Sequence, residues 1–75
     1  MKFEVKAVAL NVSTGETIAR VRVEEIDTED NPIFDGITTE AEIEDQYESY
    51  WNRISGFTNH FPHGKVKVLT VERVV

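Results

Sequence analysis

The sequence predicts an α+β fold, in which a three-stranded antiparallel sheet of ββαβ topology carries one helix packed on one face. Three features predict it. Segments 2–12 and 16–27 alternate apolar and polar residues around a short turn signal, a helix-capping motif begins at Thr39, and segment 65–75 alternates again. A chain of 75 residues suffices for one small core, so we assign residues 1–75 to a single domain.

The first two segments form a predicted hairpin around Ser13-Thr14-Gly15. A three-residue loop commonly ends on a glycine in the left-handed region, and Gly15 fits that position. Pairing Val12 with Glu16 then gives an apolar face that runs back to Phe3. The pairs expected on this face are Ala9 with Ala19, Ala7 with Val21 and Val5 with Val23.

A loop and then a helix follow the hairpin. Residues 27–37 carry Asp-Asn-Pro and Asp-Gly signals, which predict the loop. The helix begins after Thr39, because Thr39 and Glu42 match a capping box: the hydroxyl accepts from the Glu42 backbone while the Glu42 carboxylate reaches back. It ends at Ser55, because Gly56 suits the left-handed cap position.

One stripe of this helix is apolar and aromatic, and we expect it to face the sheet. Its members are Ile43, Tyr47, Tyr50 and Ile54. The far side carries Glu44, Asp45, Glu48 and Asn52. The strands offer small alanines opposite the large rings, so the crowding of aromatic residues indicates core packing. Trp51, at the margin of the stripe, is the one aromatic residue that we keep as a candidate for contact with a partner.

The third strand, residues 65–75, is expected beside the first in spatial order 2-1-3, because strand-helix-strand connections cross over with a right hand. The helix covers one face, so surplus aliphatic side chains would form a patch on the open face. That patch comprises Val8, Leu10, Ile18, Leu69 and Val71. We therefore expect a homodimer through the open face or the edge of the third strand. The alternative is a β-bulge near Ala7-Val8 and Val68-Leu69 that turns the surplus inward.

Charge is strongly separated along the chain. The net charge is −6, yet the residues outside 24–48 sum to +5, from eight basic and three acidic residues. Within that window stand eleven acidic residues and no lysine or arginine. Such a charge distribution favours a cationic partner, although a face that only keeps the protein soluble is the alternative. The acidic residues expected to bind the partner are Asp30, Asp35, Glu40, Glu44, Asp45 and Glu48.

Composition also indicates the cellular compartment of the protein. The chain has no cysteine, which excludes disulfides, thiol nucleophiles and thiolate metal sites and suits a reducing compartment. Lys2, Glu4 and Lys6 interrupt the apolar stretch that a signal peptide needs. No run of about 18 apolar residues could span a bilayer. We expect a cytoplasmic protein that does not bind membranes.

No catalytic, cofactor or metal site is predicted. His60 and His63 have a spacing that can serve a metal, but the sequence specifies no third ligand. Aligning Gly36 with the invariant glycine of a calcium-binding loop puts Ile33, which cannot ligate, at a ligand position. The open sheet face has basic residues but no aromatic residue for base stacking, so we expect no direct binding of nucleic acid. The sequence therefore indicates a non-enzymatic protein.

The leading hypothesis is a small acidic interaction module that binds and occludes a basic surface on a partner protein. In size and charge the chain is similar to accessory proteins encoded by phages and other mobile elements. Three alternatives stay open. The first is an inhibitor whose carboxylates mimic nucleic-acid phosphates and block a DNA- or RNA-binding protein. The others are a structural subunit of a homo-oligomer and a metal-dependent enzyme that uses the loop of His60 and His63.

Overall fold

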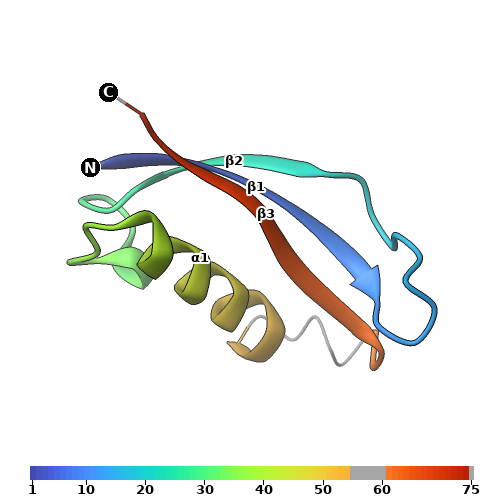
Figure 1. Ribbon diagram of the computed structural model, residues 1–75. Helices are drawn as coiled ribbons and strands as arrows, with labels where there is room; N and C mark the ends of the chain where they lie inside the picture. The colour runs from blue at the N-terminus through green and yellow to red at the C-terminus, as the bar shows by residue number, and fades with distance from the viewer. Residues whose placement is uncertain (55–60, 75) are drawn as a thin grey trace.

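The computed structural model describes residues 1–54 and 61–74, and of Ile54 the backbone alone. The main elements along the chain are β1 (Lys2–Asn11), β2 (Arg22–Asp27), α1 (Glu40–Ser49) and β3 (Gly64–Val74). The strands form an antiparallel sheet in the order β2-β1-β3, and α1 packs across one face of it (Figure 1). The predicted α+β fold and strand order are confirmed.

The turn between β1 and β2 is one residue longer than predicted. Asn11 Oδ1 accepts a hydrogen bond from the backbone N–H of Ser13 at 2.9 Å, a turn-forming contact that asparagine favours. The backbone N–H of Asn11 donates to the carbonyl of Glu16 at 2.8 Å, so the turn closes on Asn11 and Glu16, and Val12 belongs to the loop. Gly15 takes the expected left-handed conformation, with φ at +75°.

Beyond this turn, the β1–β2 ladder opens before it resumes in a register different from the predicted one. Leu10 pairs with Thr17 in an isolated bridge and Ala7 pairs with Arg22, so two residues of β1 face four residues, 18–21. Because side chains alternate between faces, a slip of one residue moves the whole of β2 to the opposite face. The side chains that change sides are Arg22 and Glu24, which face α1, and Val21 and Val23, which are exposed.

The β1–β3 pairing contains the β-bulge that the sequence offered as the alternative. Lys6 lies opposite Thr70 and Ala7 lies opposite Val68, so Leu69 is an extra residue in β3. The bulge changes the phase of β3, and valines on both sides of it therefore pack toward α1. These valines are Val66, Val68 and Val71.

The aliphatic residues predicted to lie on the open face are divided between two environments. Ile18 and Val71 pack against the core, so their predicted orientation is wrong. Val8 is 9% exposed and Leu10 is half-buried, while Leu69 at the bulge is 50% exposed. The bulge and the opened ladder explain the difference, because both change which side chains reach the core.

The core lies between the sheet and α1. Ile43 and Tyr47 are buried there, as the predicted stripe requires, while Tyr50 and Trp51 are half-buried at its edge. Phe34, in a segment predicted to be a loop, also joins the core, and its ring centroid lies 6.4 Å from that of Tyr47. The core comprises Phe3, Val5, Ala7, Ala9, Ile26, Phe34, Ile43, Tyr47, Val66 and Val68.

The start of α1 is capped as predicted. Thr39 Oγ1 accepts from the backbone N–H of Glu42 at 3.3 Å, and the Glu42 carboxylate accepts from the Thr39 hydroxyl at 2.8 Å. The α-helix ends at Ser49 and continues as a π-helical turn, Tyr50–Ile54. The predicted helix end at Ser55 lies outside the described residues.

Candidate functional site

Two side chains of the helical segment bind the outer edge of β3. The Asn52 amide pairs with both backbone groups of Val66: Nδ2 donates to the carbonyl at 3.0 Å, and Oδ1 accepts from the N–H at 2.8 Å. One turn earlier, Glu48 Oε2 accepts from the backbone N–H of Val68 at 3.0 Å. An unpaired strand edge can pair with another chain, and these contacts close part of it.

These contacts give Glu48, one of the predicted partner-binding residues, a different role. The helical period puts Glu48 on the far side of α1, yet its side chain is half-buried and its carboxylate accepts from β3. A hydrogen bond to a charged acceptor is stronger than one between neutral groups. Glu48 therefore has a structural role in holding the helix on the sheet.

The other acidic residues of α1 remain exposed, and we call Glu40, Glu42, Glu44 and Asp45 the acidic helix face. Glu40, Glu44 and Asp45 form no ion pair with any residue in ranges 1–54 and 61–74. A shallow hollow on the surface of α1 is lined by Ala41, Glu42, Glu44, Asp45 and Glu48. This surface thus presents several carboxylates without counter-charges from the described chain.

The loop between β2 and α1 contributes two further exposed carboxylates, Asp30 and Asp35. Asn31 Oδ1 accepts from the backbone N–H of Ile33 at 3.1 Å, and Gln46 Nε2 of α1 donates to the Ile33 carbonyl at 3.0 Å. The loop therefore has a fixed conformation beside the N-terminal part of α1 (Figure 1). Five of the six predicted partner-binding acids are exposed on this loop and the helix.

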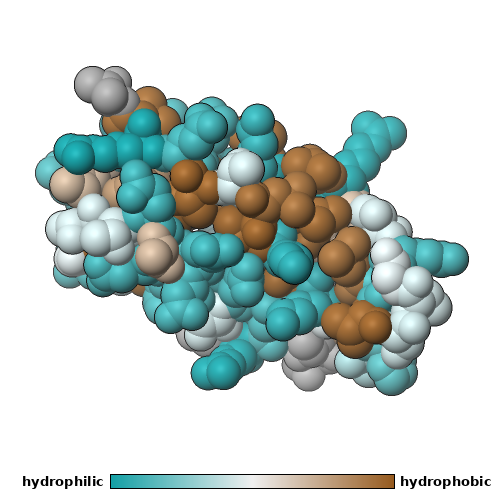
Figure 2. Space-filling view, in the orientation of Figure 1, coloured by the Kyte–Doolittle hydropathy of each residue, from teal (hydrophilic) through white to brown (hydrophobic). Residues whose placement is uncertain are grey.

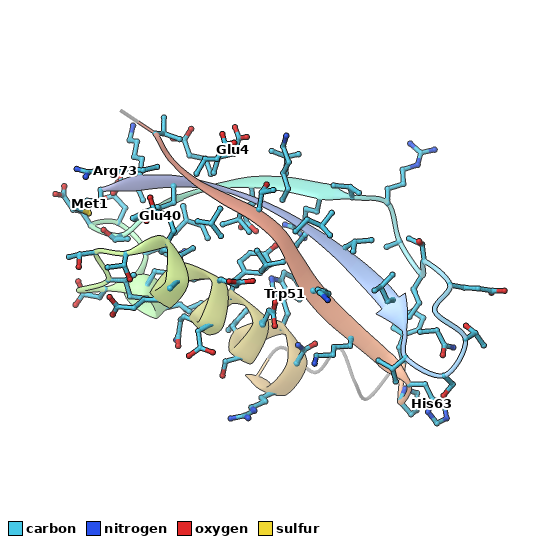
Figure 3. The ribbon with its side chains drawn as sticks, viewed as in Figure 1. Met1, Glu4, Glu40, Trp51, His63 and Arg73 are labelled. Atoms are coloured by element: carbon cyan, nitrogen blue, oxygen red, sulfur yellow. The ribbon has the colours of Figure 1, made fainter. Side chains whose placement is uncertain are left out.

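The shifted register of β2 brings charged side chains against the aromatic end of the helical segment. Tyr47 donates from its hydroxyl to Glu24 Oε2 at 3.1 Å, and Arg22 Nε lies 3.7 Å from the same oxygen. The guanidinium carbon of Arg22 is 5.3 Å from the ring centroid of Trp51, which is a cation–π contact. Trp51, the predicted contact aromatic, is half-buried between the helical segment and the sheet (Figure 3).

This four-residue cluster shifts the pKa of Tyr47. Burial, together with the charge and the hydrogen bond of Glu24, raises the pKa of Tyr47 to about 12. The phenol keeps its proton to a higher pH than an ordinary tyrosine, and it is the donor to Glu24. Neither Arg22 nor Glu24 was predicted as a site residue, because the predicted register turned both side chains away from α1.

The open face of the sheet carries charges of both signs. Glu4 lies on the face of the sheet away from α1 (Figure 3). It pairs with Glu25 of β2 on one side and with Glu72 of β3 on the other, so three carboxylates form a row on this face. Like charges directly opposite each other are unfavourable, and Lys2, with Nζ 3.9 Å from Glu25, offsets part of this repulsion. The lysines that follow on the same face are Lys6, Lys65 and Lys67.

Apolar side chains gather over the middle of the sheet (Figure 2). Val23 is 57% exposed because its partner in β1 is Lys6, which puts it on the face away from α1. The sequence predicted the opposite orientation for Val23. We call Leu10, Val23 and Leu69 the open-face patch, while Val8, between them on the same face, is buried.

Of the two histidines predicted as possible metal ligands, the structure describes His63. His63 is exposed and lies at the opposite end of the molecule from Glu40 (Figure 3), while His60 is outside the described residues. Within the described residues, no group of three or more histidine, aspartate or glutamate side chains could hold a metal ion.

No protein-family model, curated protein or solved structure matches the chain. Among the described residues, no helix has the length and apolar character that crossing a membrane requires. Function is therefore inferred from the surfaces of this chain: the acidic helix face, the open-face patch and the cluster around Arg22.

Proposed function

We propose that this chain is a small non-enzymatic interaction module that binds, and thereby occludes, a basic surface on a partner protein. The contact surface is the acidic helix face together with the adjoining loop. The observation that supports this proposal is that Glu40, Glu44 and Asp45 are exposed and form no ion pair in the described part of the chain. A cationic partner would supply the counter-charges that the described chain lacks there.

The arrangement of charges on α1 favours binding over mere solubility. Glu44 lies four residues from both Glu40 and Glu48. Like charges at this spacing destabilise a helix by about 0.2–0.5 kcal/mol per pair. A surface whose only role is to keep a protein soluble usually carries interspersed charges of both signs. Residues 24–48, in contrast, include no lysine or arginine. A bound cationic surface would relieve the repulsion.

The fold holds the backbone that carries these carboxylates in place before any partner binds. Asn52 and Glu48 tie the helical segment to β3, and Gln46 ties the acidic loop to α1. Groups that are already ordered lose less conformational entropy on binding. Attraction between opposite charges also speeds the encounter and makes it sensitive to salt. Because the chain lacks cysteine, we place this encounter in a reducing compartment such as the cytoplasm.

Affinity capture from an extract of the source cells tests the proposal. The wild type should capture a basic protein, and a variant with Glu44→Lys and Asp45→Lys should not. A variant with Glu16→Lys and Glu72→Lys has the same net charge and should still capture it, because both positions are exposed away from α1. Raising the salt from about 50 mM to about 500 mM should release the partner. Equal capture by the two variants, or capture that is insensitive to salt, would overturn the proposal.

A further inference from the structure

A pocket of about 170 Å³ opens where β1 and β2 separate. Ala7 and Ala9 of β1 contribute to its lining on the face of the sheet that carries α1. Tyr47 and Trp51 of the helical segment provide an aromatic wall, and Arg22 borders the pocket with an exposed side chain. The pocket is thus mainly apolar, with a cationic rim.

The pocket follows from the opened β1–β2 ladder. Segment 18–21 is longer than the two residues of β1 that it faces, so this segment leaves the ladder between the bridge at Thr17 and the start of β2. Ala19 and Arg20 of this segment also line the pocket. Alanines at three lining positions leave the space unfilled, because each contributes a single methyl group.

The rim carries net positive charge. Arg22 is held in position, with Nε 3.7 Å from Glu24 and its guanidinium over the ring of Trp51. Arg20 is exposed and makes no ion pair within the described residues. Two arginines against one glutamate leave an excess of one positive charge. Guanidinium groups present several donors in a plane, which matches a carboxylate.

We infer that this pocket binds a carboxylic acid with one apolar or aromatic body, either a free acid or the C-terminal residue of a peptide. The ring of such a ligand would lie against Trp51 and the alanines, and its carboxylate would meet Arg20 and Arg22. The volume fits, because an apolar cavity of about 150 Å³ accommodates a benzene ring. This site has the opposite charge from the acidic helix face, so it requires a different ligand from the proposed basic partner.

Trp51 is the only tryptophan of the chain and provides the readout. Titration with phenylacetate should change its fluorescence along a saturable curve, with a dissociation constant on the order of 1 mM for so small a ligand. Phenylacetamide has the same ring but no charge and should bind about tenfold more weakly, because charged hydrogen bonds contribute more than neutral ones. Equal responses to the two compounds, or responses that do not saturate, would overturn the inference.

Two variants at exposed positions test the site without disturbing the core. Arg20→Gln should weaken binding of phenylacetate several-fold and leave binding of phenylacetamide unchanged. Ala19→Leu should weaken both, because the larger side chain occupies the pocket. Lys67→Gln removes the same charge from the open face of the sheet and should leave both affinities as in the wild type. An Arg20→Gln affinity equal to that of Lys67→Gln would contradict the inference.

Peptides distinguish the two sources of the carboxylate. A short peptide ending in phenylalanine should bind with a free C-terminus and lose most of its affinity when the C-terminus is amidated. Tighter binding of this peptide than of phenylacetate would identify a C-terminal residue as the ligand, and weaker binding would identify a free acid. Equal binding of the free and the amidated peptide would contradict the role of the arginines.

Discussion

The hydroxyl of Tyr47 on α1 donates a hydrogen bond to the carboxylate of Glu24 on β2, across 3.1 Å. The same carboxylate oxygen lies 3.7 Å from Arg22, whose guanidinium lies over Trp51. The contact therefore links the helical segment to the edge strand β2 through a polar cluster, as Asn52 and Glu48 link it to the other edge strand, β3. It also helps to hold Arg22 at the rim of the pocket.

Tyr47→Phe should lower the free energy of unfolding by about 1–2 kcal/mol, because it removes a hydrogen bond to a charged acceptor and keeps the buried ring. Urea denaturation followed by circular dichroism measures the change. Tyr50→Phe is the matched control, since Tyr50 is half-buried and contacts Trp51 through its ring. A Tyr50→Phe loss as large as that of Tyr47→Phe would show that the Glu24 contact contributes nothing specific.

The raised pKa of Tyr47 predicts a loss of stability at alkaline pH. The pKa is about 10 in the unfolded chain and about 12 in the folded protein, so folding favours the protonated phenol. This contribution is fully present below about pH 10 and disappears as the pH rises through about 12. The quantity to measure is the difference in unfolding free energy between wild type and Tyr47→Phe, because this difference isolates the contribution of the Tyr47 hydroxyl. That difference should shrink from pH 10 to 12, and a constant difference would refute the prediction.

Local patterns in the sequence are sufficient to predict the order of the elements, the strand order and the helix cap at Thr39. Each depends on periodicity or on residues a few positions apart. The register of β2 depends on the turn, where Asn11 Oδ1 accepts from the N–H of Ser13 and displaces the expected three-residue loop. It also depends on the extra residues in 18–21, which no periodicity reveals. A slip of one residue exchanges the two faces of a strand. The wrong register therefore placed Arg22 and Glu24 on the open face, and their cluster with Tyr47 and Trp51 was not predicted.

The exposed acids of α1 could be predicted because helical period and charge are visible in the sequence. The role of Glu48 and Asn52 could not. A helical period shows which residues share a stripe, but not where across the sheet the helix lies. Since α1 lies close enough to the β3 edge for side chains to reach Val66 and Val68, residues on the flank of the helix bind backbone groups. A polar residue on a helix flank is therefore ambiguous until the position of the helix is known.

The Asn52 amide is predicted to protect the edge of β3. Asn52→Ala would leave the N–H and the carbonyl of Val66 without this partner, so the free energy of unfolding should fall by about 1–3 kcal/mol. The exposed edge should also increase aggregation, measured by light scattering over time. Ser49→Ala, in the preceding turn, is the control and should change neither quantity appreciably. Unchanged stability and solubility in Asn52→Ala would show that the edge needs no protection.

The acidic helix face is predicted to cost stability, which separates its role from folding. Glu44→Lys would form opposite-charge pairs with Glu40 and Glu48, four residues away on either side. Replacing two repulsive pairs by two attractive pairs should raise the free energy of unfolding by about 1–2 kcal/mol in total. Thermal denaturation at low salt measures the gain, and Glu44→Gln should give about half of it. A destabilised Glu44→Lys would mean that Glu44 supports the fold, and loss of partner binding in that variant could no longer be assigned to the contact surface.

The open-face patch predicts weak self-association, in place of the larger surface that the sequence suggested. Ile18 and Val71 pack against the core, so the exposed apolar area depends mainly on Val23 and Leu69, at 57% and 50% exposure. A patch this small should give a dimer only at high micromolar concentration. Light scattering coupled to size exclusion should show a mass that rises with concentration, and Val23→Lys with Leu69→Lys should abolish the rise. Val12→Lys, at an exposed valine in the turn, should leave it intact. A wild type that remains monomeric at several hundred micromolar would exclude association through this face.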